Sequence, residues 1–178
     1  MERKPFVYKS PIGDIYCLFE GVFLIEVHIE GSNQLKEGSR IQGFKEARRQ
    51  LDHLDPRPLE SLLKNELDAY FNDHLNEFKQ KIKFITGTDF EHKVWLALKE
   101  IPYGETRSYK WISEKVGRPK AMRAVGQALK KNPMPIILPC HRVIASDGSI
   151  GGFSCGVEIK GWLLRHEGAY GKRGMSIQ

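Results

Sequence analysis

The chain has 178 residues, of which 40% are apolar, and it carries a net charge of +6. This length and apolar content suffice for one good core or two modest ones without disulfide support. No apolar run is long enough to span a bilayer and the first ten residues lack a signal-peptide pattern, so we expect a soluble cytoplasmic protein.

The first thirty residues predict a small antiparallel sheet. β-branched and aromatic side chains are concentrated in three short segments, and turn sequences separate these segments. The segments are residues 6–8, 15–19 and 22–29.

Helices are expected to follow the sheet. Apolar residues recur at helical spacing over residues 44–54 and 59–75, and Pro56 separates the two runs. Residues 78–86 are expected to form an extended linker. We therefore place a supporting first domain at residues 1–85.

The second half opens with signals for three helices. Thr88 followed by Glu91 fits a capping box for a helix that runs to about residue 100. Residues 108–116 predict a second helix, Gly117 ends it in a left-handed conformation, and Pro119 opens a third that continues to about residue 131. The last two helices form a helix-turn-helix pattern.

The chain ends with one more amphipathic helix and a basic tail. Residues 157–167 predict a helix with Trp162 and Leu163 facing inward. We place the second domain at residues 86–170 and a flexible tail at 171–178. The fold class is α+β: an N-terminal antiparallel sheet with helices, joined to a mostly helical domain that contains the helix-turn-helix.

The positive charge is confined to the second half. Residues 1–85 contain 13 Lys and Arg against 14 Asp and Glu, whereas residues 86–178 contain 15 against 8. The charge is densest over residues 106–131, where eight basic residues accompany the single acid Glu114. Such a stretch favours a phosphate-binding surface, because neutralising phosphates releases counterions from nucleic acid. A solvated helix face is the alternative.

The sequence Pro-Cys-His-Arg-Val at residues 139–143 places a thiol beside an imidazole. A thiol reacts as its thiolate, and a neighbouring base is the usual means of forming one. Cys140 could instead be an inert buried cysteine. The three cysteines, Cys17, Cys140 and Cys155, lack the paired spacing of a zinc or disulfide framework, so we expect reduced thiols and no metal.

With its flanks from Thr88 to Gly168, this pentapeptide closely resembles the active-site region of the O6-alkylguanine-DNA alkyltransferases. The resemblance implies a monomeric DNA repair enzyme without a cofactor. It would bind double-stranded DNA containing O6-alkylguanine through the minor groove and flip the damaged base out. The alkyl group would then pass irreversibly to Cys140, so that each molecule acts once.

The resemblance assigns DNA binding to the second helix of the helix-turn-helix. Arg123 matches an arginine finger that fills the space left by the extruded base. Taken alone, this arginine would be a phosphate contact, and the small residues around it would suit a tight helix-helix contact. The remaining residues of the matching surface are Lys120, Ala121, Met122 and Gly126.

A relay from Glu167 through His141 and a water molecule to Cys140 is implied in the same way. Glu167 also carries an argument of its own: an acid at a helix C-terminus opposes the macrodipole, and an imidazolium would compensate it. A surface glutamate is the alternative. Tyr109 matches the tyrosine whose hydroxyl donates to the guanine ring, although it could be a half-buried helix aromatic.

The resemblance further implies a pocket for the flipped base. Asn132 matches a hinge asparagine, but it could equally be a helix C-cap. The Val143 carbonyl would accept from the exocyclic amine, and Ser154, otherwise a plain loop residue, would meet the substituted oxygen through its N–H. Lys160 could be a pocket residue or a solvated one. Two further pocket positions are Pro135, in the apolar wall, and Phe153, where the family usually has tyrosine.

Two other functions compete with this interpretation. A non-catalytic module that binds alkylated DNA would use the same helix-turn-helix, but such proteins usually replace the reactive cysteine with tryptophan. A cysteine hydrolase built on Cys140 and His141 would leave the basic helices unexplained.

Overall fold

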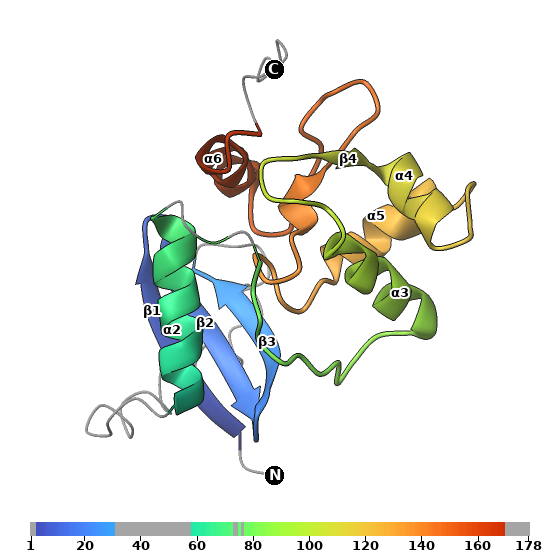
Figure 1. Ribbon diagram of the computed structural model, residues 1–178. Helices are drawn as coiled ribbons and strands as arrows, with labels where there is room; N and C mark the ends of the chain where they lie inside the picture. Colours follow the sequence, from blue (N-terminus) through green and yellow to red (C-terminus); the bar gives the residue numbers. More distant parts are fainter. Residues whose placement is uncertain (1–2, 31–57, 73–74, 76, 170–178) are drawn as a thin grey trace. The chain divides into compact units, whose positions relative to one another are not determined.

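The computed structural model describes residues 3–30, 58–72, 75 and 77–169. The chain divides into two compact units between Lys83 and Phe84 (Figure 1). The helix predicted over residues 44–54 and the tail predicted over residues 171–178 lie outside the described residues. None of the described helices is both long and apolar enough to cross a membrane.

Three antiparallel strands form the sheet of the first unit, as predicted. They pair in chain order: β1 (Arg3–Ser10), β2 (Gly13–Glu20) and β3 (Phe23–Ile29). The turn between β1 and β2 is closed by Ser10 Oγ, which accepts from the Ile12 N–H at 3.2 Å and donates to the Gly13 carbonyl at 2.6 Å. Gly13 has a φ of 106°, which a residue with a side chain rarely adopts.

Helix α2 (Pro58–Phe71) packs against this sheet (Figure 1). Tyr8 of β1 stacks on Phe71 with ring centroids 5.9 Å apart, and its hydroxyl donates to Asp68 at 2.9 Å. The buried apolar side chains of the helix, which supply its share of the core, are Leu63, Leu67 and Tyr70. α2 ends four residues before the predicted boundary.

The segment predicted as a linker joins the sheet at one point. Ile82 forms a parallel bridge with Leu24 of β3. Two backbone hydrogen bonds hold it there, from the Leu24 N–H to the Lys81 carbonyl and from the Lys83 N–H to the Leu24 carbonyl. This segment is therefore part of the first unit up to Lys83.

The second unit begins with the predicted capping box. The Thr88 hydroxyl accepts from the Glu91 N–H, and the Glu91 carboxylate accepts from the Thr88 N–H at 2.8 Å. Helix α3 follows over Asp89–Leu98 and buries Val94, Trp95 and Leu98. Phe90 is half-buried, and the Arg118 guanidinium lies 5.5 Å from its ring centroid.

The helix-turn-helix consists of α4 (Tyr109–Lys115) and α5 (Met122–Lys130). Gly117 has the expected positive φ, 74°. The prediction that Pro119 opens the second helix is wrong: the chain makes a turn there, closed by a bond from the Ala121 N–H to the Arg118 carbonyl. The Ser113 hydroxyl donates to the Pro119 carbonyl at 3.2 Å. This carbonyl is therefore satisfied by a residue of α4 and not by the backbone of α5.

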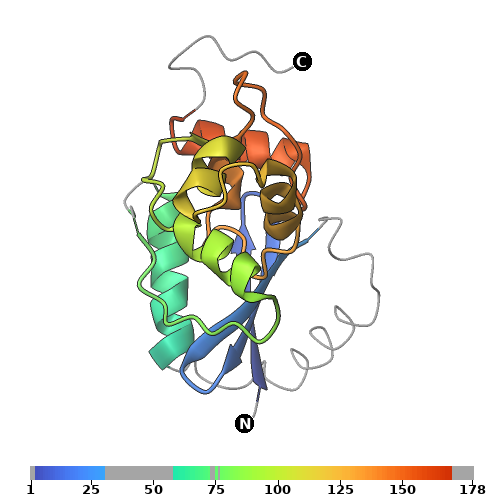
Figure 2. The ribbon, with the colours of Figure 1, turned by 90° about the vertical axis from the view of Figure 1, so that its right-hand side faces the viewer.

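Helices α3, α4 and α5 pack against one another (Figure 2). The Trp95 indole N–H donates to the Ala128 carbonyl at 2.8 Å, which ties α3 to α5 through a buried bond. A two-residue parallel ladder joins β4 (Arg107–Ser108) to β5 (Val143–Ile144). These contacts fix the strand that follows Cys140 beside the start of α4.

The last helix, α6, spans Val157–His166. Leu163 is buried as predicted, but Trp162 is half-buried and stacks on His166 with centroids 4.9 Å apart. Glu167 follows as the C-cap residue. With a three-stranded sheet in one unit and a mostly helical second unit, the α+β prediction is confirmed.

Candidate functional site

Cys140 begins a single 3-10 turn, Cys140–Arg142, at the end of a buried apolar segment. The residue is 4% exposed, and burial raises the pKa of its thiol because a thiolate is poorly solvated there. The Asn132 amide opposes this effect by donating to Sγ at 2.9 Å. At rest the sulfur therefore carries its proton, and a base is needed to remove it.

Asn132 ties the end of α5 to the segment that carries the cysteine. Its side-chain amide donates to the Leu138 carbonyl at 2.8 Å as well as to Cys140, and its oxygen accepts from the Met134 N–H at 3.1 Å. Ile136, between these anchors, has a φ of 74° and is buried. A β-branched residue in the left-handed region is strained, so the surrounding bonds impose this conformation.

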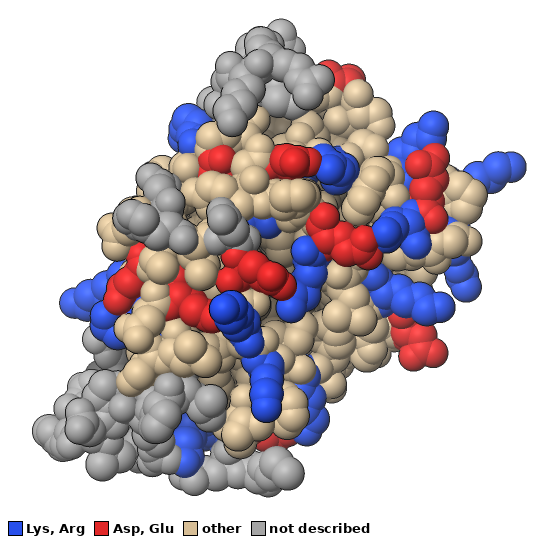
Figure 3. All heavy atoms as spheres, viewed as in Figure 1, with Lys and Arg blue, Asp and Glu red and all other residues tan. Residues whose placement is uncertain are grey.

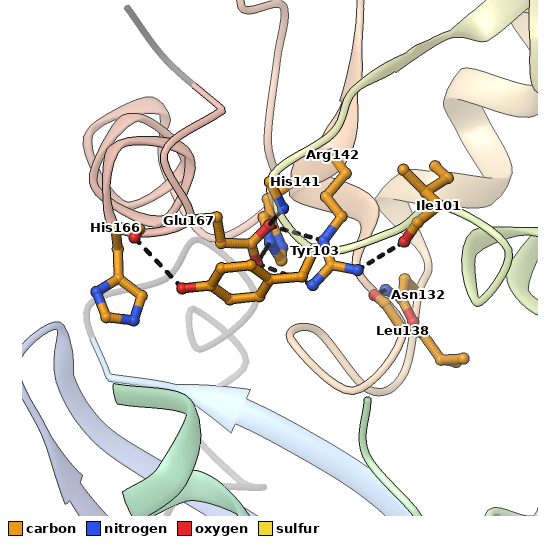
Figure 4. A network of polar contacts seen from close by, with 9 residues as sticks. Ile101, Tyr103, Asn132, Leu138, His141, Arg142, His166 and Glu167 are labelled. Atoms are coloured by element: carbon orange, nitrogen blue, oxygen red, sulfur yellow. Dashed lines mark hydrogen bonds and ion pairs between the residues drawn. The ribbon is translucent and has the colours of Figure 1, made fainter. Parts of the chain in front are cut away.

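Glu167 is the centre of a buried ionic cluster (Figure 4). Its carboxylate lies 2.8 Å from His141 Nε2 and accepts from Arg142 at 2.8 and 3.0 Å. Burial opposes ionisation of Glu167, but the contacts with His141 and Arg142 outweigh it and hold the carboxyl pKa well below its ordinary value. His141 contacts this acid as expected, and the guanidinium of Arg142 supplies a second, charged partner that the sequence analysis did not name.

The cluster also fixes which nitrogen of His141 carries the proton. An ionised carboxylate can only accept, so Nε2 must be the protonated nitrogen. Burial lowers the pKa of His141, and Arg142 and Lys160 lower it further against the opposing effect of Glu167. The imidazole is therefore neutral, and Nδ1 keeps its lone pair. Among the described residues Nδ1 is buried and has no hydrogen-bond partner.

Lys160 of α6 has a fully buried side chain, so the alternative of a solvated lysine is wrong. Its ammonium donates to the Val143 carbonyl at 2.6 Å and to the Gly152 carbonyl at 3.3 Å. Burial lowers its pKa to about 8, while Cys140 acts in the opposite direction. Lys160 thus cross-links β5 to the loop that precedes α6.

Tyr109 lies between α5 and the same loop. A Cβ placed on Gly151 would lie 3.2 Å from the Tyr109 hydroxyl, and one placed on Gly126 would lie 3.8 Å from its ring. The half-buried tyrosine has a raised pKa, first because of burial and then because of its electrostatic interaction with Cys140. A phenol in this setting keeps its proton and can donate it.

The loop before α6 contributes the remaining predicted pocket residues. The Phe153 ring lies edge-on to His141, with centroids 6.5 Å apart, and Ser154 is half-buried. Cys155 is buried, which raises its pKa to about 12, so this thiol stays protonated. Pro135 is buried as expected of a wall residue.

The exposed face of the helix-turn-helix is basic. Figure 3 shows Lys and Arg interleaved with acids over the region of α4. Four of the eight basic side chains have a carboxylate partner: Arg107, Lys110, Lys115 and Lys131 pair with Glu105, Glu114, Glu100 and Glu91. The other four are exposed and have no carboxylate partner among the described residues: Arg118, Lys120, Arg123 and Lys130. Met122 is exposed beside them, and Ala121 and Gly126 are half-buried.

The chain matches known proteins over nearly its whole length. Residues 89–169 match the family model of the 6-O-methylguanine DNA methyltransferase DNA binding domain. The methylated-DNA-protein-cysteine methyltransferase of Methanosarcina barkeri is 41% identical over 161 residues, which cover 90% of this chain and 94% of that protein. This chain belongs to the methylated-DNA-protein-cysteine methyltransferase family.

Solved structures extend the match with this methyltransferase family to the fold. A crystal structure of Mycobacterium tuberculosis OGT in complex with DNA has a TM-score of 0.75 and 36% identity, and covers 94% of this chain and 92% of that chain. The O6-methylguanine-DNA methyltransferase of the archaeon Pyrococcus kodakaraensis has a TM-score of 0.64, 26% identity, and coverage of 94% and 99%. The resemblance inferred from sequence is confirmed.

The structure brings most of the predicted catalytic and substrate-binding residues of this methyltransferase together. Direct contacts connect Cys140 to Asn132, His141 to Glu167 and Phe153, and Lys160 to Val143. Sequence reasoning missed Arg142, although it directly follows His141. A buried arginine needs an anion, and the acid that pairs with it lies 25 positions further along the chain.

Proposed function

We propose that this protein repairs O6-alkylguanine in DNA by accepting the alkyl group on Cys140, once per molecule. The observation that carries the proposal is the state of His141. Its Nε2 is bonded to Glu167, and its Nδ1, which has no hydrogen-bond partner among the described residues, is a base on the residue that follows Cys140, whose thiol is protonated at rest. This relay lies within the residues that match the methyltransferase family.

The relay from Glu167 through His141 would remove the proton from the thiol of Cys140. A water molecule between Nδ1 and Sγ would pass the thiol proton to His141, whose new charge Glu167 stabilises. The thiolate attacks the alkyl carbon, the carbon–oxygen bond breaks, and its electron pair leaves with the guanine. Tyr109 donates a hydrogen bond or its proton to the purine ring as the charge develops.

Binding of the flipped base is assigned to the residues around the sulfur. The Val143 carbonyl accepts from the exocyclic amine, and the Ser154 N–H meets the substituted oxygen. Pro135 and Phe153 supply apolar contact. Asn132 and Lys160 hold the segments that present these groups, as their hydrogen bonds to Leu138, Val143 and Gly152 support.

We assign the binding of duplex DNA to α5, which would lie in the minor groove. Supporting observations are the four exposed basic residues without carboxylate partners and the DNA complex of the related Mycobacterium tuberculosis protein. Arg123 would enter the duplex as the base leaves, while Lys120, Ala121, Met122 and Gly126 lie along the groove. We propose that the protein acts as a cytoplasmic monomer.

The proposal is tested by intact mass after incubation with duplex DNA containing O6-methylguanine. We expect a gain of one methyl group on the peptide that carries Cys140, with one methyl per molecule at saturation. Cys140→Ala should gain none, whereas Cys17→Ala, which alters a buried cysteine in the other unit, should react normally. Repeated turnover, or methyl on another residue, would contradict the mechanism.

The role of Arg123 has a separate test. Arg123→Ala should slow transfer from a fully paired duplex more than from one in which the lesion is badly mispaired, because extrusion then costs less. Single-turnover rates on the two duplexes measure the difference. An equal loss of rate on both would assign Arg123 to phosphate contact instead.

A further inference from the structure

Arg142 is bound directly to Glu167, the residue that orients His141 in the proposed relay. Its Nε and one terminal nitrogen grip both oxygens of Glu167, and its other terminal nitrogen donates to the Ile101 carbonyl at 2.7 Å. The Tyr103 ring lies against its guanidinium at 5.8 Å. The side chain is almost fully buried, so this fork is held rigidly (Figure 4).

The charges of Glu167, Arg142 and His141 balance only if His141 is neutral. Glu167 and Arg142 cancel each other, so a proton added to His141 would leave these three buried groups with one net positive charge. Lys160 on α6 adds a second cation nearby, and Cys140 is uncharged at rest. Without Arg142, Glu167 would be an uncompensated buried anion, and His141 would be the nearest group able to take up a proton.

We propose that Arg142 is a positioning residue for alkyl transfer: its paired guanidinium keeps His141 unprotonated, so that Nδ1 remains available as a base. This inference rests on the proposed function, in which Nδ1 receives the thiol proton. Arg142 touches neither substrate nor sulfur in this scheme. It acts through Glu167.

A purely structural role for Arg142 predicts something different. The bond to Ile101 and the contact with Tyr103 could simply tie the 3-10 turn to the chain after α3. Loss of that tie would lower stability and overall rate, but it would leave the protonation of His141 unchanged. The titration of His141 therefore separates the two roles.

The experiment follows the imidazole of His141 by NMR as a function of pH in the full-length protein. In Arg142→Met the titration midpoint should rise by about one pH unit or more, a tenfold or larger increase in proton affinity. The acid limb of the methyl-transfer rate should move to higher pH by the same amount. Arg142→Lys keeps the positive charge but loses the paired hydrogen bonds to Glu167. Its midpoint should return most of the way to that of the unmodified protein.

A matched control is Arg165→Met, which removes an exposed positive charge from the last turn of α6. It should leave both the midpoint and the rate profile unchanged. If Arg142→Met does not unfold cooperatively, Glu167→Gln is compared with Glu167→Gln/Arg142→Met. The midpoint should be higher in the double variant, where no guanidinium faces His141.

An unchanged midpoint in folded Arg142→Met, or equal midpoints in the second pair, would overturn the inference. The methyl gain of the unmodified protein is measured separately. Absence of that gain with a shifted midpoint would overturn the proposed function, whereas a normal gain with no shift would overturn only the role of Arg142.

Discussion

Asn132 illustrates how much one buried side chain can hold in this protein. Its amide serves the Leu138 carbonyl, the Met134 N–H and the sulfur of Cys140. Three groups lose a partner if the amide is removed, and each is buried. Such a residue contributes both to stability and to the position of the nucleophile.

We therefore expect Asn132→Ala to destabilise the protein by about 1–3 kcal/mol or more, because buried groups are left without hydrogen bonds. Urea denaturation measures the change. Asn72→Ala is the control: it removes an exposed amide that bonds the Asp68 carbonyl, and it should cost about 0.5 kcal/mol or less. Equal effects of the two substitutions would contradict this account.

Glu167 gives a prediction for pH. Its carboxyl pKa is lowered in the folded protein, so its stabilising effect is complete above the ordinary value of 4.5 and is lost as the pH falls below it. Glu167→Gln should cost about 3–5 kcal/mol at neutral pH, since it leaves the Arg142 charge buried and unpaired. The difference in the free energy of unfolding between the unmodified protein and Glu167→Gln should become smaller as the pH falls.

Denaturant unfolding of both proteins at pH 7, 5, 4 and 3 provides the measurement. A gap that stays constant over this range would mean that the carboxylate is not held ionised by its neighbours.

At the scale of the element, α3 is stabilised at its first turn by local sequence. Thr88 and Glu91 satisfy each other's backbone N–H groups, and the helix then delivers Trp95 to α5. Thr88→Ala should destabilise the protein by about 1 kcal/mol through loss of the cap. Thermal unfolding should show little change for Thr86→Ala, which alters an exposed threonine just outside the helix. Equal losses would argue against the cap.

Helix α5 allows a sharper test of DNA binding, because two adjacent lysines differ in their partners. Lys131 pairs with Glu91 at 2.7 Å, whereas Lys130 is exposed, has no carboxylate partner among the described residues, and follows Arg123 by seven positions on one helix face. Lys130→Ala should reduce the slope of log affinity against log salt by about 1. Lys131→Ala should change it less, as measured by titrating duplex DNA at several salt concentrations. The reverse order would refute the assignment.

At the scale of the whole molecule, local patterns in the sequence predicted elements well and long-range chemistry poorly. The capping box at Thr88 and the stop at Gly117 depend on neighbours within a few residues, and both are correct. Pro119 obeys a local rule for helix starts, but hydrogen bonds within the turn compete with it, so α5 begins at Met122.

The site was predictable only through its likeness to a known family. Spacing alone left Cys140, Asn132 and Lys160 with ordinary alternatives, because burial and partners arise from distant segments. Lys160 occupies a helix position that could face water, yet its ammonium meets two backbone carbonyls. Arg142 was overlooked for the same reason, as its partner Glu167 is supplied by the end of α6.

The left-handed backbone at Ile136 has a mechanical consequence. A β-branched residue in that region stores roughly 1–3 kcal/mol, and the tethers at Met134 and Leu138 on either side keep the energy from being released. The hydrogen bonds of Asn132 thus hold the segment that carries the sulfur in a strained conformation. Loss of the Asn132 hydrogen bonds would therefore release this strain in the segment that carries the nucleophile.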